Sequence, residues 1–249
     1  VTLELGGKSA AIILDDADLD ATMKGLRSAS FVNNGQTCYL SSRILAPRSR
    51  YDDVVAALVA LVDGMKVGDP LDPATDIGPL VSARQRERVL GYIEAGRNSD
   101  AKLVVGGSVP ADQPRGWFVA PTVFADVHNS DRIAQEEIFG PVLAVIPYDG
   151  DAEAIALAND SRYGLSAGPI RNQRILSEHR PDVLIALRQS GLSIASATVN
   201  WSSRIGRSRS ATASTTRTRA SSRCAIAAAS WSLPGTTRGS PAPCPRRSR

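Results

Sequence analysis

The chain has few of the residue types that build metal centres and disulfide frameworks. Its 249 residues include three cysteines and two histidines. No two cysteines form a Cys-x-x-Cys pair and neither histidine stands at a ligand spacing, so we expect no metal site. No uncharged apolar run approaches the roughly 18 residues that a membrane span needs. No basic segment followed by an apolar one opens the chain. We therefore expect neither a membrane protein nor a secreted one.

Lysine is absent after residue 102, and this absence marks two unlike parts of the chain. Residues 1–168 hold 15 Lys and Arg against 23 Asp and Glu, a net charge of −8. Residues 169–249 hold 14 Arg against two acidic residues, a net charge of +12. The overall charge of +4 therefore describes neither part, and we interpret them as separate regions.

Residues 1–168 show alternating strand and helix signals. Short apolar runs bounded by turn residues predict buried strands, and apolar stripes at helical spacing predict helices. The expected strands are 10–14, 43–46, 102–105, 122–127 and 142–146, and the expected helices are 18–30, 50–65, 82–96 and 151–159. This alternation favours an α/β fold with a mostly parallel sheet flanked by helices.

Residues 169–249 are rich in Arg, Ser and Ala, with few larger apolar side chains. Such a segment cannot bury enough surface to offset the entropy of ordering it, so we predict a disordered tail. Within it, residues 183–199 are compatible with a marginal helix or strand. The positive charge of residues 169–249 suggests binding to nucleic acid or another acidic surface. That alternative is the weakest, because the tail shows no recognisable nucleic-acid module.

Cys38 is the first candidate for chemistry. It follows Asn33-Asn34-Gly35-Gln36-Thr37, a polar turn at the end of an apolar helix. A structural cysteine more often lies within an apolar run, whereas a loop cysteine can face a cleft and act as a nucleophile if its thiolate is stabilised. Judged alone, a lone cysteine is still more often structural.

Two acidic segments are the other candidates. Glu4 stands between Leu3 and Leu5, so we expect partial burial, which raises a carboxyl pKa and suits a general base. The alternative is an outward-facing residue on a half-exposed strand. Glu136-Glu137-Ile138-Phe139-Gly140-Pro141 precedes a buried strand, and a position at an element end often faces a cleft. The alternative there is a helix end with solvated acids.

The three segments occur together, and this combination resembles the signatures of the NAD(P)-dependent aldehyde dehydrogenase superfamily. The segments are Leu-Glu-Leu-Gly-Gly-Lys-Ser at 3–9, Asn-Gly-Gln-Thr-Cys at 34–38 and Glu-Glu-Ile-Phe-Gly-Pro at 136–141. Their order and the separation of Glu4 from Cys38 also match. Residues 76–80 and 159–168 look like further motifs of that family. The resemblance covers essentially all of residues 1–168.

The resemblance implies a fold of the aldehyde dehydrogenase catalytic-domain type and a mechanism. Cys38 would attack the aldehyde to give a thiohemiacetal, which passes hydride to the nicotinamide of NAD or NADP and leaves a thioester. Glu4 would activate the water that hydrolyses it. The backbone N–H of Cys38 and an Asn side chain would form the oxyanion hole. Glu137 would hydrogen-bond the nicotinamide ribose, and Phe139 would pack near the nicotinamide.

The same resemblance implies a small aldehyde substrate and homo-oligomers. The missing signal segment and the need for a reduced thiol predict a cytoplasmic location. In that family the oxyanion-hole Asn and the contacts to adenosine and pyrophosphate precede the Glu4 segment. We therefore expect residues 1–168 to be an incomplete catalytic domain without most of the dinucleotide-binding domain. The alternative to an enzyme is a truncated remnant that keeps Cys38 and Glu4 but does not hold cofactor.

The change of composition near residue 168 predicts a frameshift. A lysine-free, Arg-, Ser- and Ala-rich segment that starts abruptly is what out-of-frame translation of GC-rich DNA produces. We expect resequencing of the locus to give one frame that continues the family pattern beyond residue 168. Peptides of the tail found at the abundance of the rest of the protein would contradict this.

Overall fold

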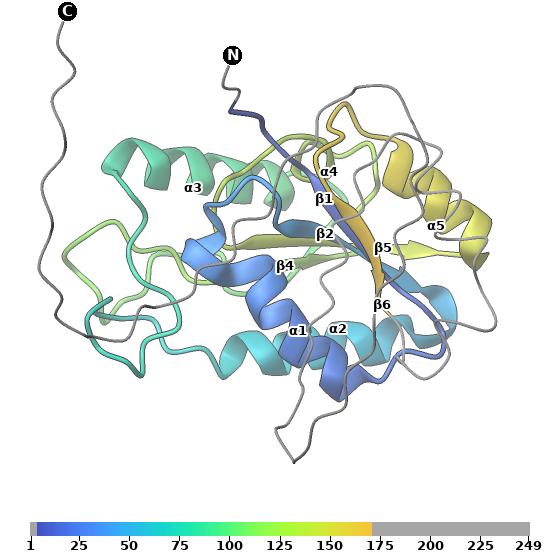
Figure 1. Cartoon of the computed structure of the whole chain (residues 1–249). Coiled ribbons are helices and arrows are strands. Elements are labelled where there is room, and N and C mark those ends of the chain that lie inside the picture. The colour runs from blue at the N-terminus through green and yellow to red at the C-terminus, as the bar shows by residue number, and fades with distance from the viewer. Residues whose placement is uncertain (1–3, 171–249) are drawn as a thin grey trace, which may run out of the picture. The chain divides into compact units, whose positions relative to one another are not determined.

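The structure, a computed structural model, describes residues 4–170, so the predicted tail from residue 171 onward, including 183–199, lies outside the described residues. A six-stranded sheet has the order β3-β4-β5-β2-β1-β6 (Figure 1). Its strands are β1 Ser9–Ile13, β2 Ser41–Pro47, β3 Lys102–Val105, β4 Thr122–Ala125, β5 Val142–Tyr148 and β6 Ala167–Ile170. All pairs are parallel except β3 with β4. The predicted α/β fold with a mostly parallel sheet is confirmed.

Helices cover both faces of this sheet, as parallel strands require. They are α1 Leu19–Phe31, α2 Tyr51–Asp63, α3 Ala83–Arg97, α4 Arg132–Gln135 and α5 Gly150–Asn159, with short 3-10 turns η1 Val32–Gly35 and η2 Arg48–Arg50. Figure 1 shows α1 and α2 together on one side, with α3 and α5 on the other.

Two apolar cores follow from the pleat of the strands, which turns alternate side chains to opposite faces. Ala11 and Ile13 of β1 pack with residues of α1 and α2 in one core. Ala10 and Ile12 pack in the other core with residues of α3, α4 and α5. The strands are therefore buried on both sides, which explains their continuous apolar runs in the sequence.

The helix boundaries have local causes that the sequence contains. Asp18 caps α1 by accepting a hydrogen bond from the Ala21 N–H at 3.0 Å, and Ser82 caps α3 through the Gln85 N–H at 3.2 Å. Both are preferred N-cap residues, because their side-chain oxygens satisfy amides that the helix leaves unpaired. The predicted helices at 18–30 and 82–96 agree with α1 and α3 to within one residue at each end.

Two elements were not predicted. Helix α4 has four residues, too few for a periodic apolar pattern. Strand β6 contains Gly168 and Pro169, which weaken a strand signal, but it lies at the sheet edge, where proline is tolerated. The strand runs past Gly168, where the sequence pattern stops being legible. Across residues 4–170, no helix has the length and apolar character to cross a membrane.

The guanidinium of Arg43 ties the sheet to the surrounding elements. Arg43 lies in β2 and is 1% exposed. Its Nε donates to the Lys8 carbonyl at 3.1 Å, and its Nη atoms donate at 2.8 Å to Asn129 Oδ1 and to the carbonyls of Leu157 and Ala158 at the end of α5. Burial lowers its pKa to about 10. One side chain thus joins the entry to β1, the loop after β4 and the C-terminus of α5.

We predict that Arg43→Met lowers the free energy of unfolding by about 3–5 kcal/mol, because it leaves four acceptors without a donor, three of them in fully buried bonds. Urea titration followed by circular dichroism measures this. Arg48→Met is the matched control. Its ion pair with Asp149 is exposed, so its loss should change the stability little. Equal urea midpoints for the two variants would contradict this stabilising role of Arg43.

Candidate active site

The three segments that the sequence singles out meet at one edge of the sheet. Residues 4–8 lead into β1, residues 36–40 into β2, and residues 136–141 into β5. These three strands are neighbours and parallel, in the order β5-β2-β1. Segments that precede parallel neighbours must lie side by side at their amino ends. This is the edge opposite to the one where open α/β sheets usually bind ligands.

The turn before Cys38 has an unusual backbone that its residues suit. Asn33, Asn34 and Gly35 take positive φ values of 52°, 58° and 75°, in the left-handed region that Asn and Gly tolerate best. The Asn34 side chain accepts from the Gly78 N–H at 2.7 Å and donates to the Pro79 carbonyl at 3.0 Å. The predicted helix stop is confirmed, and the loop at 78–79 holds the turn in place.

Two glycines allow the three segments to touch. A Cβ on Gly7 would overlap the carbonyl oxygen of Cys38, and a Cβ on Gly35 would overlap the carbonyl of Gly140. Segment 4–8 therefore packs directly on the backbone of Cys38, and the Cys38 turn packs directly on segment 136–141. Only glycine permits backbones to approach this closely. Cys38, in the turn that contacts both segments, is a half-buried free thiol.

The carboxylate of Glu137 links the first and third segments. Its Oε1 accepts a hydrogen bond from the Gly7 N–H at 2.9 Å. Helix α3 holds the backbone of this segment, because Arg88 donates to the Glu137 carbonyl at 2.7 Å and Gln85 donates to the Phe139 carbonyl at 2.7 Å. Phe139 itself has a φ of 60° and is half-buried. Neither Gln85 nor Arg88 belongs to a motif in the sequence; both lie in the helix predicted at 82–96.

Glu136 faces a different environment from its neighbour Glu137. The Tyr92 hydroxyl donates to its Oε2 at 2.7 Å and Arg132 Nε at 3.1 Å, and these contacts hold the pKa of Glu136 below its usual range. The guanidinium groups of Arg88 and Arg132 lie 5.2 and 4.7 Å from the centre of the Tyr92 ring, within cation–π range. Glu136 therefore anchors the end of α4 to α3.

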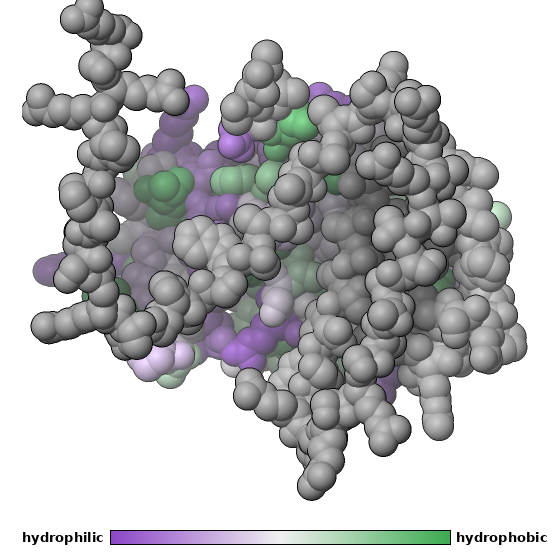
Figure 2. Space-filling view, in the orientation of Figure 1, coloured by the Kyte–Doolittle hydropathy of each residue, from purple (hydrophilic) through white to green (hydrophobic). Residues whose placement is uncertain are grey.

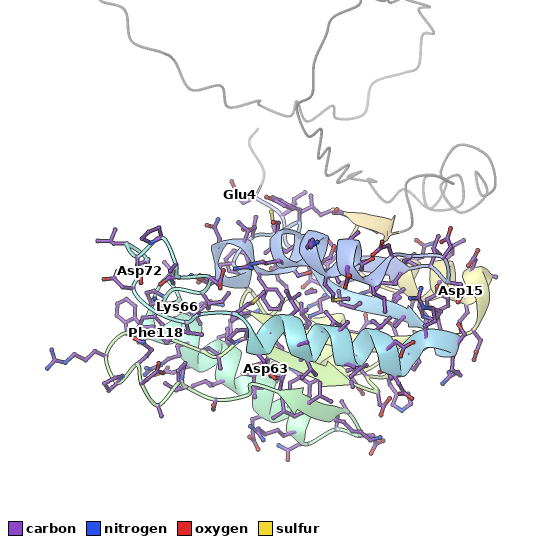
Figure 3. The ribbon with its side chains drawn as sticks, turned by 90° about the horizontal axis from the view of Figure 1, so that it is seen from below. Glu4, Asp15, Asp63, Lys66, Asp72 and Phe118 are labelled. Carbon is purple, nitrogen blue, oxygen red and sulfur yellow. The ribbon has the colours of Figure 1, made fainter. Side chains whose placement is uncertain are left out.

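The expected partial burial of Glu4 is wrong: its side chain is exposed, as is Leu5 beside it. Figure 3 shows Glu4 at the margin of the fold, directed away from the helices. The apolar neighbours suggested a strand, but β1 begins only at Ser9, so Glu4 has no flanking strands to cover it. Among residues 4–170, Glu4 has no hydrogen-bond or ion-pair partner.

A small hollow lies where the segments converge. Its lining comes from all three, together with the start of β2 and the end of α1: Gly7, Ser30, Gly35, Thr37, Leu40, Ser42, Glu137, Ile138, Phe139 and Gly140. Tyr39, beside Cys38, and Val32 are large residues left about half exposed. Where Figure 2 shows the described residues, hydrophobic and hydrophilic side chains are intermixed. No cluster of three potential metal ligands occurs within the described range.

Comparison with known proteins identifies the family. The model of the aldehyde dehydrogenase family matches residues 1–174. Geranial dehydrogenase of Castellaniella defragrans is 59% identical over 165 residues, which are 66% of this chain and 34% of that protein. Betaine aldehyde dehydrogenase of Sinorhizobium fredii is 46% identical over 169 residues, 68% of this chain and 35% of that protein. The chain belongs to the aldehyde dehydrogenase family.

Solved structures agree with this. The Mycobacterium tuberculosis aldehyde dehydrogenase, complexed with NAD+, aligns with a TM-score of 0.69 and 51% identity over 75% of this chain and 37% of that one. A mutant aldehyde dehydrogenase from Pseudomonas syringae, in complex with NAD+ and octanal, aligns with a TM-score of 0.70 and 40% identity, covering 74% and 38%. The chain spans about a third of the length of the relatives that it matches.

We predict that Gly7→Ala disturbs the site, because the added methyl group must displace the Cys38 backbone. The free energy of unfolding should fall by about 1–3 kcal/mol, as overpacking usually costs. The rate of Cys38 alkylation by iodoacetamide, located by peptide mass spectrometry, should change with it. Gly25→Ala is the control: nothing lies within 4 Å of its added Cβ in α1, so it should stabilise by about 0.5–1 kcal/mol. A Gly7→Ala protein with wild-type stability and alkylation would refute the close packing.

Proposed function

We propose that residues 1–168 carry the covalent chemistry of an aldehyde dehydrogenase, in which Cys38 is the nucleophile and Glu4 the general base. The observation that carries the proposal is the convergence of the Glu4, Cys38 and Glu137 segments around one hollow. The boundary of the catalytic region at residue 168 is part of the same proposal. Family membership supports it, because the roles come from motifs that this chain matches in order.

In the proposed reaction, the Cys38 thiolate forms a bond to the aldehyde carbon. The electron pair of the C=O π bond moves to the carbonyl oxygen. The backbone N–H of Cys38 stabilises the resulting oxyanion, as donors fixed in a turn do best. The contacts that hold this turn rigid are the Asn34 clasp on residues 78–79 and the packing of Gly35 on Gly140. Tyr39 and Val32 are about half exposed, and we propose that they contact the rest of the substrate.

Glu4 is proposed to remove a proton from the water that attacks the Cys38 thioester, which releases the carboxylic acid and restores the thiol. Its exposed position gives it direct access to water. It precedes Gly7, whose backbone packs on Cys38, by three positions. The proposal therefore requires this segment to move so that the carboxylate reaches Cys38.

The residues present fit the nicotinamide end of an NAD-type cofactor, in the form of NAD or NADP. Glu137 offers carboxylate oxygens suited to ribose hydroxyls, and Phe139 offers an aromatic face at the rim of the same hollow. When bound, the cofactor supplies the oxidant for the step from thiohemiacetal to thioester. Glu137 and Phe139 are thus proposed to place the cofactor against Cys38.

The substrate is proposed to be a small aldehyde, and the assembled protein a homo-oligomer. Cytoplasmic location fits a catalytic thiol, which must stay reduced.

The proposal predicts hydrolysis of an activated ester such as p-nitrophenyl acetate, which needs Cys38 and Glu4 but no cofactor. We expect a burst of nitrophenol with the acetyl group on Cys38, located by mass spectrometry, and none for Cys38→Ser. Glu4→Gln should keep the burst but slow the steady state by about 100-fold, as loss of a general base does.

Glu87→Gln, which removes an exposed carboxylate from α3, is the control and should leave both phases unchanged. If wild type and Cys38→Ser behave alike, the alternative of an inactive remnant holds instead. If Glu4→Gln and Glu87→Gln behave alike, Glu4 is not the base.

A further inference from the structure

Phe139 has a backbone conformation that its residue type disfavours. Its φ of 60° lies in the left-handed region, where the Cβ of a bulky side chain crowds the backbone. The other non-glycine residues with positive φ in the described part of the chain are Asn33, Asn34 and Asp126, types that tolerate this region. A strained aromatic residue persists only where its surroundings hold it, and such strain gathers at functional sites.

The side-chain amide of Gln85 holds the backbone on both sides of Phe139. Its Nε2 donates to the carbonyl of Ile138 at 3.1 Å and to the carbonyl of Phe139 at 2.7 Å. These two carbonyls belong to the peptide units before and after the Phe139 Cα. In an extended backbone successive carbonyls point to opposite sides, so one amide group does not reach both. The two bonds therefore oppose an extended Phe139 and fit the turned conformation of this residue.

The same face of α3 holds the residues on either side of this turn. Arg88 donates to the Glu137 carbonyl at 2.7 Å, and a Cβ on Gly140 would overlap the side chain of Val89. Both helix residues lie on the face that carries Gln85, because residues three and four apart are neighbours on a helix surface. The chain before and after the turned residue is therefore fixed to α3, so its own conformation decides where the aromatic ring points.

We propose that Gln85 is a positioning residue that holds Phe139 in the left-handed conformation and so keeps its ring at the hollow where the three segments converge. Phe139 lines this hollow together with Thr37 and Leu40, which stand on either side of Cys38 in the chain. Without the two bonds, the backbone would relax to the negative φ that an aromatic residue prefers, and the ring would leave the hollow. That the ring meets the nicotinamide rests on the proposed function; the link from Gln85 to Phe139 does not.

The test is NMR spectroscopy of the full chain with Gln85→Glu, which keeps the size of the side chain and removes both donors. A positive φ brings the amide and α protons of one residue close together, so wild-type Phe139 should show a strong NOE between them. In Gln85→Glu this NOE should fall several-fold. Gln113→Glu makes the same chemical change in the loop between β3 and β4. It is the control and should leave the Phe139 NOE unchanged.

A fluorine label reports where the ring lies. The chain has four phenylalanines, so 4-fluorophenylalanine gives four fluorine resonances, and Phe139→Leu assigns one of them. Gln85→Glu should shift the Phe139 resonance toward that of the free amino acid. The resonances of Phe31 and Phe124, which are buried in the two cores, should stay in place.

A glutamine that merely supports packing gives a different pattern. Its replacement would move the core resonances together with that of Phe139, and that result would overturn the proposal. So would a folded Gln85→Glu protein in which the Phe139 NOE and fluorine resonance are both unchanged.

The wild-type chain provides a second test that needs no folded variant. Each of the two side-chain amide protons of Gln85 donates to a carbonyl, so each should exchange with solvent about tenfold more slowly than those of Gln113. Equal exchange at the two glutamines, or a weak Phe139 NOE in the wild type, would overturn the proposal.

Nicotinamide mononucleotide separates the role of Gln85 from the proposed function. If Phe139 faces the cofactor, this compound should shift the Phe139 fluorine resonance in the wild type and have less effect in Gln85→Glu. If it leaves the wild-type resonance in place while Gln85→Glu moves the ring as expected, the cofactor role of Phe139 fails and the positioning role of Gln85 is supported.

Discussion

The described part of this protein depends on a cation buried in the middle of its sheet. Arg43 lies on β2, which stands between β5 and β1, the two other strands that lead away from the candidate active site. Its hydrogen bonds reach the residue before β1 and the last turn of α5. The carbonyls at a helix C-terminus have no partners within the helix and carry partial negative charge, so a guanidinium is well matched to them. Arg43 thus donates the hydrogen bonds that water would supply to these carbonyls at an exposed helix end.

This bond network places the site. Because β5, β2 and β1 are adjacent, the segments before them share one edge, and Arg43 fixes the entry to β1 by holding the Lys8 carbonyl. Gly7, one residue earlier, then packs on the Cys38 backbone and donates its N–H to the Glu137 carboxylate. The geometry around Cys38 is therefore set mostly by backbone contacts. Side chains such as Asn34 and Gln85 act on backbone groups in turn.

Periodicity was sufficient to predict the long elements, because each is buried on a continuous strip. It failed for α4 and β6, since four residues carry no period and Gly168-Pro169 opposes a strand. The motifs themselves were visible, but their meeting depends on strand order, which pattern alone does not supply. Glu4 was misjudged for a related reason. Apolar neighbours predict burial only if other strands lie alongside, and at residue 4 none do.

Arg43 and Lys8 are both buried near the amino ends of the strands, and their surroundings differ. Arg43 has an acceptor for each of its hydrogen bonds, four in all, and its burial is compensated by neutral carbonyl and amide oxygens. Lys8 has no such acceptor among the described residues, and the residues that favour its charge are acids on another segment. A satisfied buried charge is explained by the structure that it holds together. The Lys8 ammonium lacks such bonds within the described residues, and burial therefore lowers its pKa.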